Sequence, residues 1–102
     1  MRPVKQKPPK KDHKALYSAL LKLQTLEEMQ SFLADLCTPG ELDALADRWE
    51  VARLLERGVP YREIYDRTGV STATVTRVAR ALLHGMGGYQ RALNQNKESE
   101  RN

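Results

Sequence analysis

The sequence has few features that could cross-link the chain or hold it in a membrane: its 102 residues include one cysteine and no long hydrophobic run. The single Cys37 excludes an internal disulfide and offers no metal-ligand spacing. No apolar stretch approaches the ~20 residues that cross a bilayer, and the N-terminus lacks the hydrophobic segment of a signal peptide. We therefore expect a cytoplasmic protein of one domain, without a membrane partner.

Signals of catalysis are missing as well. His13 and His84 lie far apart, and neither has a cysteine or carboxylate at ligand spacing, so no zinc site is expected. No nucleophile has a recognisable base beside it, and there is no glycine-rich phosphate-binding loop. We expect neither an enzyme nor a bound cofactor.

Positive charge is concentrated at the N-terminus. Residues 1–14 carry six Lys/Arg against one Asp, whereas residues 15–90 carry eight against ten carboxylates. An arm rich in lysine and proline has too few apolar groups to fold alone, so residues 1–11 are expected to be a basic flexible arm. The arm would either contact DNA phosphates, which makes binding salt-dependent, or serve only as a solubilising tail.

Apolar residues recur at helical spacing, and no strand pattern is present. We predict a first helix near residues 12–24 and a second helix that Thr25 and Glu28 begin as a capping box. The segment Thr38-Pro39-Gly40-Glu41 repeats this start signal for a third helix, which runs to about Arg57 before Gly58 ends it.

Residues 59–85 carry the clearest functional pattern. A helix over roughly residues 60–67 is followed by the turn Thr68-Gly69-Val70 and by a second helix for which Ser71 is a natural N-cap. Two helices joined by a short turn that contains glycine are typical of a helix-turn-helix, here over residues 60–84. We expect these inward-facing side chains: Ile64, Tyr65, Val75, Val78, Ala79, Leu82 and Leu83.

The C-terminal residues complete the predicted architecture. Gly85, Gly87 and Gly88 should break the fifth helix, a short last helix should cover residues 89–95, and residues 96–102 should be a disordered tail. The expected fold is all-α, with six helices in one domain over residues 12–95.

The helix that Ser71 begins is crowded with hydroxyl groups in its first turns. Threonine is a mediocre helix former, so four hydroxyls here are not explained by helicity. Short hydroxyls and small methyl groups can contact bases and phosphates in a major groove. The alternative is a solvated, threonine-rich helix start. The candidate DNA-binding residues are Arg62, Ser71, Thr72, Ala73, Thr76 and Arg80.

Leucines on the first helix cover more than one of its faces. Leu16, Tyr17, Leu20, Leu21 and Leu23 are more than a helix wet on one side requires. A helix packed between two subunits explains them, and a helix-turn-helix protein needs two copies to read two half-sites. The alternative is a well-buried core helix.

Taken together, the chain resembles the Trp repressor superfamily, in particular its YerC/YecD-type Trp-repressor-like branch. The resemblance covers about residues 12–95 and implies an intertwined homodimer in which the first three helices of each subunit interlock. The matching residues are Thr38-Pro39, Ala44-Leu45, Arg48, Gly58, Arg62-Glu63, Gly69 and Ala73-Thr74-Val75-Thr76-Arg77.

The resemblance assigns roles by position. Arg62, Thr72, Ala73 and Thr76 match DNA-contacting positions of the Trp repressor. Its tryptophan pocket, where the indole lies between two guanidinium groups, is matched by a candidate effector pocket of Thr38, Arg48, Thr74 and Arg77. The implied effector is an amino acid or an indole-type molecule.

Two departures argue against L-tryptophan. Val78 stands where the Trp repressor has a glycine beside the ligand, and a β-branched residue should narrow or fill that site. Ala81 replaces a serine that helps to fix the amino group. Arg48 and Arg77 would then serve as scaffold or phosphate contacts.

Two hypotheses follow. The first is a homodimeric, sequence-specific regulator of transcription, in particular a repressor, whose partner is double-stranded DNA. The second is a dimeric ligand-sensing or protein-interaction adaptor with little specific DNA binding.

Overall fold

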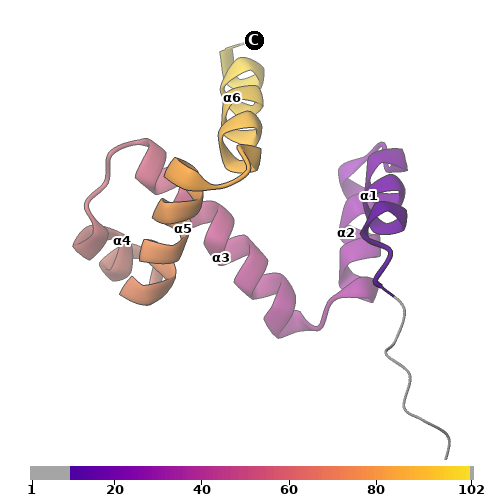
Figure 1. Ribbon diagram of the computed structural model, residues 1–102, viewed down its shortest axis with the longest axis horizontal. Helices are drawn as coiled ribbons and strands as arrows, with labels where there is room; N and C mark the ends of the chain where they lie inside the picture. Colours follow the sequence, from indigo (N-terminus) through magenta and orange to yellow (C-terminus); the bar gives the residue numbers. More distant parts are fainter. Residues whose placement is uncertain (1–9, 102) are drawn as a thin grey trace, which may run out of the picture. The chain divides into compact units, whose positions relative to one another are not determined.

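The computed structural model describes residues 10–101, with side chains through Lys97, and every regular element in this range is a helix. The expectation of six helices and no strand is confirmed for these residues. The residues expected to form the flexible arm lie largely outside the described part. The helices are α1 (His13–Lys22), α2 (Leu26–Leu36), α3 (Pro39–Glu56), α4 (Tyr61–Thr68), α5 (Thr72–His84) and α6 (Gly88–Arg101) (Figure 1).

The chain divides into two compact units, Met1–Leu36 and Cys37–Asn102. The first unit contains α1 and α2. Asp12 caps α1 by accepting the N–H of Ala15 at 3.0 Å. At the start of α2, Thr25 Oγ1 accepts the N–H of Glu28 as expected, but the Glu28 carboxylate accepts the N–H of Gln24 instead of that of Thr25.

No residue of α1 or α2 is buried. Leu21 and Leu26 are 85% and 80% exposed, and Tyr17 is 57% exposed. The side chains that are half-buried recur at helical spacing, namely Leu16, Ala19, Leu20, Leu23, Met29, Phe32 and Leu33. The two helices are therefore amphipathic but enclose no core of their own.

The second unit begins with the capping box predicted for α3. Thr38 Oγ1 accepts the N–H of Glu41 at 3.1 Å, and the Glu41 carboxylate accepts the N–H of Thr38 at 2.8 Å. Hydrogen bonding to the Glu41 carboxylate, first from the Thr38 backbone N–H and then from the Thr38 side chain, lowers the pKa of Glu41. The start of α3 is therefore fixed by local chemistry alone.

An aliphatic core holds α3, α4 and α5 together, and Figure 1 shows these three helices next to one another. Trp49, Leu55, Val59, Leu82 and Tyr89 pack against this core while remaining partly exposed. Part of this core comes from the helix-turn-helix itself, and the packing of Val75 and Val78 against α3 and α4 fixes the position of α5. Its buried members are Val51, Ala52, Leu54, Ile64, Val70, Val75 and Val78.

Two residues expected to face inward do not. Tyr65 is 48% exposed and Leu83 is 76% exposed. Each is the immediate neighbour of a more deeply packed residue, Ile64 or Leu82, and successive helical positions point about 100° apart. The short α4 therefore buries Ile64 alone.

The C-terminal helix is longer than expected. Gly88 begins α6 instead of only breaking α5, and the backbone is helical through Arg101, where we expected a disordered tail from residue 96. Leu93, only 5% exposed, anchors the helix, and the Lys97 ammonium pairs with Glu56 of α3 at 2.7 Å. The sequence pattern showed a polar tail, but it did not show these two tertiary contacts.

Among the described residues, no helix combines the length and the apolar character that crossing a membrane requires.

Candidate nucleic-acid interface

The turn between α4 and α5 is built from three consecutive residues. Gly69 takes the left-handed conformation (φ 73°), which a side chain would strain, and its N–H donates to the carbonyl of Tyr65 at 2.8 Å. The Thr68 hydroxyl donates to the Ile64 carbonyl and accepts the N–H of Val70. Val70 is 8% exposed and belongs to the buried core, so its side chain packs between the two helices.

Ser71 is the N-cap of α5, as predicted. Its hydroxyl oxygen accepts the N–H of Thr74 at 3.2 Å and lies 3.1 Å from the Thr74 hydroxyl. The cap satisfies one of the free N–H groups at this helix start. Ser71 and Thr74 therefore hold the helix start in place.

The outward face of α5 is uncharged at its start and basic further along. Val75 and Val78 are buried on the opposite face. Helix α5 contains two arginines, Arg77 and Arg80, and no aspartate or glutamate. All six candidate DNA-binding residues are exposed, namely Arg62, Ser71, Thr72, Ala73, Thr76 and Arg80.

Arg62 extends from α4 with 86% of its side chain exposed. Its nearest acidic partner is Asp66, with 3.7 Å between Arg62 Nε and the carboxylate oxygen. Such an exposed pair contributes little, so the guanidinium can exchange this partner for a base or a phosphate.

The exposure of two tyrosines of α4 was not foreseen. Tyr65 lies four residues after Tyr61, and the two are 48% and 44% exposed. The i, i+4 spacing of the two tyrosines is the signal that could have identified them as one exposed face of α4.

The four candidate effector residues come from two helices. Thr38 and Arg48 are ten residues apart on α3, which is about 15 Å along a helix, while Thr74 and Arg77 lie on α5. Thr38 is engaged in the capping box, Arg48 and Thr74 are half-buried, and Arg77 is exposed. A pocket that includes both Thr38 and Arg48 must therefore be long or be completed by a second chain.

Val78 belongs to the core, with 1% of its surface exposed. Ala81 is half-buried. The valine methyl groups thus occupy space within the core of this unit.

Comparison with known proteins matches residues 11–97 to the model of the Trp repressor protein family. The "Uncharacterized protein YerC" of Bacillus subtilis is 47% identical over 85 residues, which cover 83% of this chain and 82% of that protein. A "Trp operon repressor homolog" of Actinobacillus succinogenes is 46% identical over 54 residues, or 52% of this chain and 54% of that protein.

Among solved structures, a TrpR like protein from Eubacterium eligens superimposes with a TM-score of 0.79 at 39% identity. The match covers 82% of this chain and 87% of that one. Sequence and structure thus agree over nearly all the described residues, and the chain belongs to the Trp repressor family of DNA-binding regulators.

Proposed function

We propose that this protein is a homodimeric, sequence-specific regulator of transcription, and in particular a repressor. The observation that carries the proposal is the outward face of α5, where exposed hydroxyl and methyl groups precede two arginines without a carboxylate in that helix. In a helix-turn-helix, these first turns meet base edges in the major groove. The proposed base-facing residues are Thr72, Ala73 and Thr76, and the proposed supporting contacts are Arg62, Ser71 and Arg80.

The homodimer is supported by the exposed apolar faces of α1 and α2. A helix pair with leucines up to 85% exposed gains stability by packing against another chain. Two recognition helices spaced one DNA turn apart would then read a pseudo-palindromic site. The relatives named as Trp operon repressor homologs support the assignment as a repressor.

The test is selection of genomic DNA fragments by the purified protein. The wild type should enrich one pseudo-palindromic motif. The double variant Thr72→Ala/Thr76→Val should lose preference at the central bases of each half-site, because the hydroxyls that discriminate them are gone. The control Gln95→Ala, on the exposed surface of α6, should enrich the wild-type motif. Enrichment of no motif by the wild type would overturn the proposal and favour a protein-interaction adaptor.

We also propose an amino-acid or indole-type effector held by Thr38, Arg48, Thr74 and Arg77, and we infer that L-tryptophan itself is excluded by Val78. The support is the burial of Val78 in the core, since an indole placed against this side chain, as the resemblance implies for L-tryptophan, would need space that its methyl groups fill. An indole-type effector would therefore have to contact the four residues without lying against Val78. Titration calorimetry should give no heat with millimolar L-tryptophan. A saturable heat together with raised DNA affinity would overturn this inference.

A further inference from the structure

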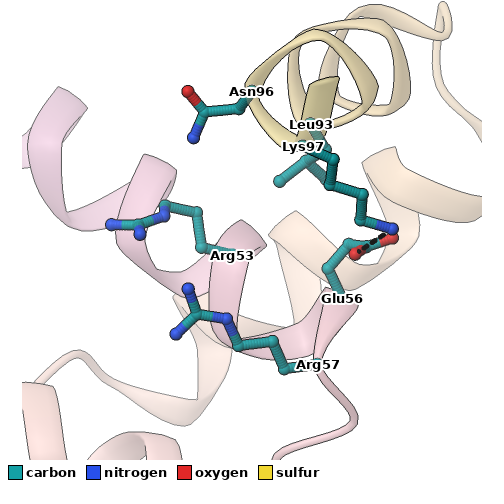
Figure 2. Close-up of a pocket in the computed structure, with 6 residues that line it drawn as sticks. All are labelled: Arg53, Glu56, Arg57, Leu93, Asn96 and Lys97. Carbon is teal, nitrogen blue, oxygen red and sulfur yellow. Dashed lines mark ion pairs between the residues drawn. The ribbon is translucent and has the colours of Figure 1, made fainter. Parts of the chain in front are cut away.

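A pocket lies between the last turns of α3 and the middle of α6 (Figure 2). Its volume is about 120 Å³. Leu93, 5% exposed, contributes an apolar wall. The polar side chains that line it are Arg53, Glu56, Arg57, Asn96 and Lys97. None of them belongs to the candidate DNA-binding surface or to the candidate effector pocket.

The lining is basic. It contains three cations and one carboxylate, and that carboxylate is already engaged, because Glu56 Oε1 lies 2.7 Å from Lys97 Nζ. Arg53 Nη1 pairs with Glu50 at 3.1 Å, which leaves other N–H groups of this guanidinium unused. Arg57 has no ion-pair partner among the side chains that the structure describes.

The two arginines stand one helical turn apart, and Figure 2 shows both guanidinium groups extending in the same direction from the end of α3. Arginines near a helix end often bind its last carbonyls. Here the carbonyls of Arg53, Leu54 and Leu55 already accept backbone N–H groups of residues 57–59. Among the described residues, the side-chain hydrogen bonds of these two arginines are limited to that from Arg53 to Glu50, so their remaining N–H donors are available for a ligand.

We propose that this pocket binds a small organic anion through a phosphate or carboxylate group. Arg53 and Arg57 hold the oxyanion, since guanidinium geometry matches two oxygens of either group. The Asn96 amide donates a further hydrogen bond, and Leu93 packs against the carbon atoms beside the anionic group. The volume admits one such group with a few attached atoms.

The test is an NMR titration of the full chain with inorganic phosphate and, in a separate arm, with succinate. Sodium chloride keeps the ionic strength constant. We expect saturable shifts of the backbone amides at residues 53–58 and 93–97. The arm that saturates at the lower concentration identifies the preferred group, phosphate or carboxylate.

The double variant Arg53→Gln/Arg57→Gln should weaken binding at least tenfold. Arg91→Gln, which removes an exposed α6 arginine outside the pocket, should leave it unchanged. Asn96→Ala is a milder second variant that removes one hydrogen bond and should weaken binding several-fold. A circular dichroism spectrum shows that each variant is folded.

Shifts that persist in the folded double variant, or that sodium chloride alone reproduces, would overturn the proposal, as would the absence of saturation in both arms. The site does not depend on the proposed DNA binding. Selection of a DNA motif by the double variant would leave the proposed function intact even where anion binding is lost.

Discussion

The two units of this chain use similar apolar residues to different ends. In the second unit, aliphatic side chains of α3, α4 and α5 converge on a core in which Val51, Ile64 and Val75 are fully buried. In the first unit, α1 and α2 bury no residue, although leucine is abundant in both. Helical periodicity is therefore enough to form an amphipathic helix, but a core requires faces from several elements.

The change from exposed to buried apolar residues along the chain occurs within α3, and not between α2 and α3. Its buried residues, Val51, Ala52 and Leu54, all lie in its C-terminal half, while Leu45 in the first half is 43% exposed. The N-terminal half of α3 thus resembles α1 and α2. The proposed second subunit would pack against α1, α2 and the first half of α3, which bury no residue of their own. The buried core lies in the part of the chain that carries α5.

The largest effect should come from the core itself. Ile64→Ala should lower the free energy of unfolding by about 3 kcal/mol, because it leaves a cavity between α4 and its neighbours. The matched change Leu21→Ala removes a side chain that is 85% exposed within its own unit and should cost less. Chemical denaturation at one protein concentration measures both. An equal cost for the two would contradict the distinction between the units.

The next effect should fall on assembly. Leu21→Asp places a charge on the exposed apolar face of α1 and should weaken the proposed dimer by about 2 kcal/mol, or roughly thirtyfold in Kd. The control is Ser18→Asp, which adds the same charge at an exposed polar position of the same helix. Sedimentation velocity reports the dimer fraction. Equal weakening by both variants would indicate a charge effect and would argue against an apolar interface on this face.

A smaller effect is expected at the DNA-facing surface. Arg62→Ala should weaken binding to the selected site by about 1–2 kcal/mol through loss of a guanine or phosphate contact, and it should leave the dimer intact. Arg67→Ala is the control, since Arg67 lies on the same helix and pairs with Glu63 at 3.3 Å. Fluorescence anisotropy with labelled DNA measures both. A larger loss for Arg67→Ala would place the DNA on another face of α4.

The smallest effect concerns the start of α3. Thr38→Ala should lower stability by about 1 kcal/mol because the capping hydrogen bond to the Glu41 N–H is lost. The pKa of Glu41 is lowered in the folded state, so its contribution is present above its unfolded pKa and is lost as the pH falls through the folded value.

Thermal unfolding of the wild type and of Glu41→Gln across acidic pH tests whether the stabilisation by the Glu41 charge is lost as the pH falls. The stability difference between them should shrink as the pH falls. A difference that stays constant would show that the Glu41 charge has no part in the cap.

Much of this architecture could be predicted from local sequence signals. The capping hydrogen bonds at Thr38, Gly69 and Ser71 join residues at most four positions apart. Local sequence patterns were therefore sufficient to place the starts of α3 and α5 and the end of α4. The six-helix expectation and the exposure of the candidate DNA-binding residues followed from the same periodicity.

The predictions that were wrong or missing concern features that depend on contacts between residues far apart in the sequence. Tyr65 and Leu83 were expected inside, but a neighbouring residue occupies the inward position in each case. The length of α6 depends on the packing of Leu93 and on the pair between Lys97 and Glu56. The basic pocket between α3 and α6 was also missed, because the spacing of Arg53 and Arg57 does not reveal what lies opposite them.

The absence of buried residues in α1 and α2 has a consequence for abundance in the cell. When part of a chain obtains its core only from a partner, folding of that part obeys mass action, and its stability increases with the total amount of protein. Dilution below the Kd of the proposed dimer would expose leucine-rich helices to proteases. If the proposed dimer forms on DNA, such a regulator would be removed fastest when it is scarce, and the threshold between an occupied and an empty binding site would be sharper.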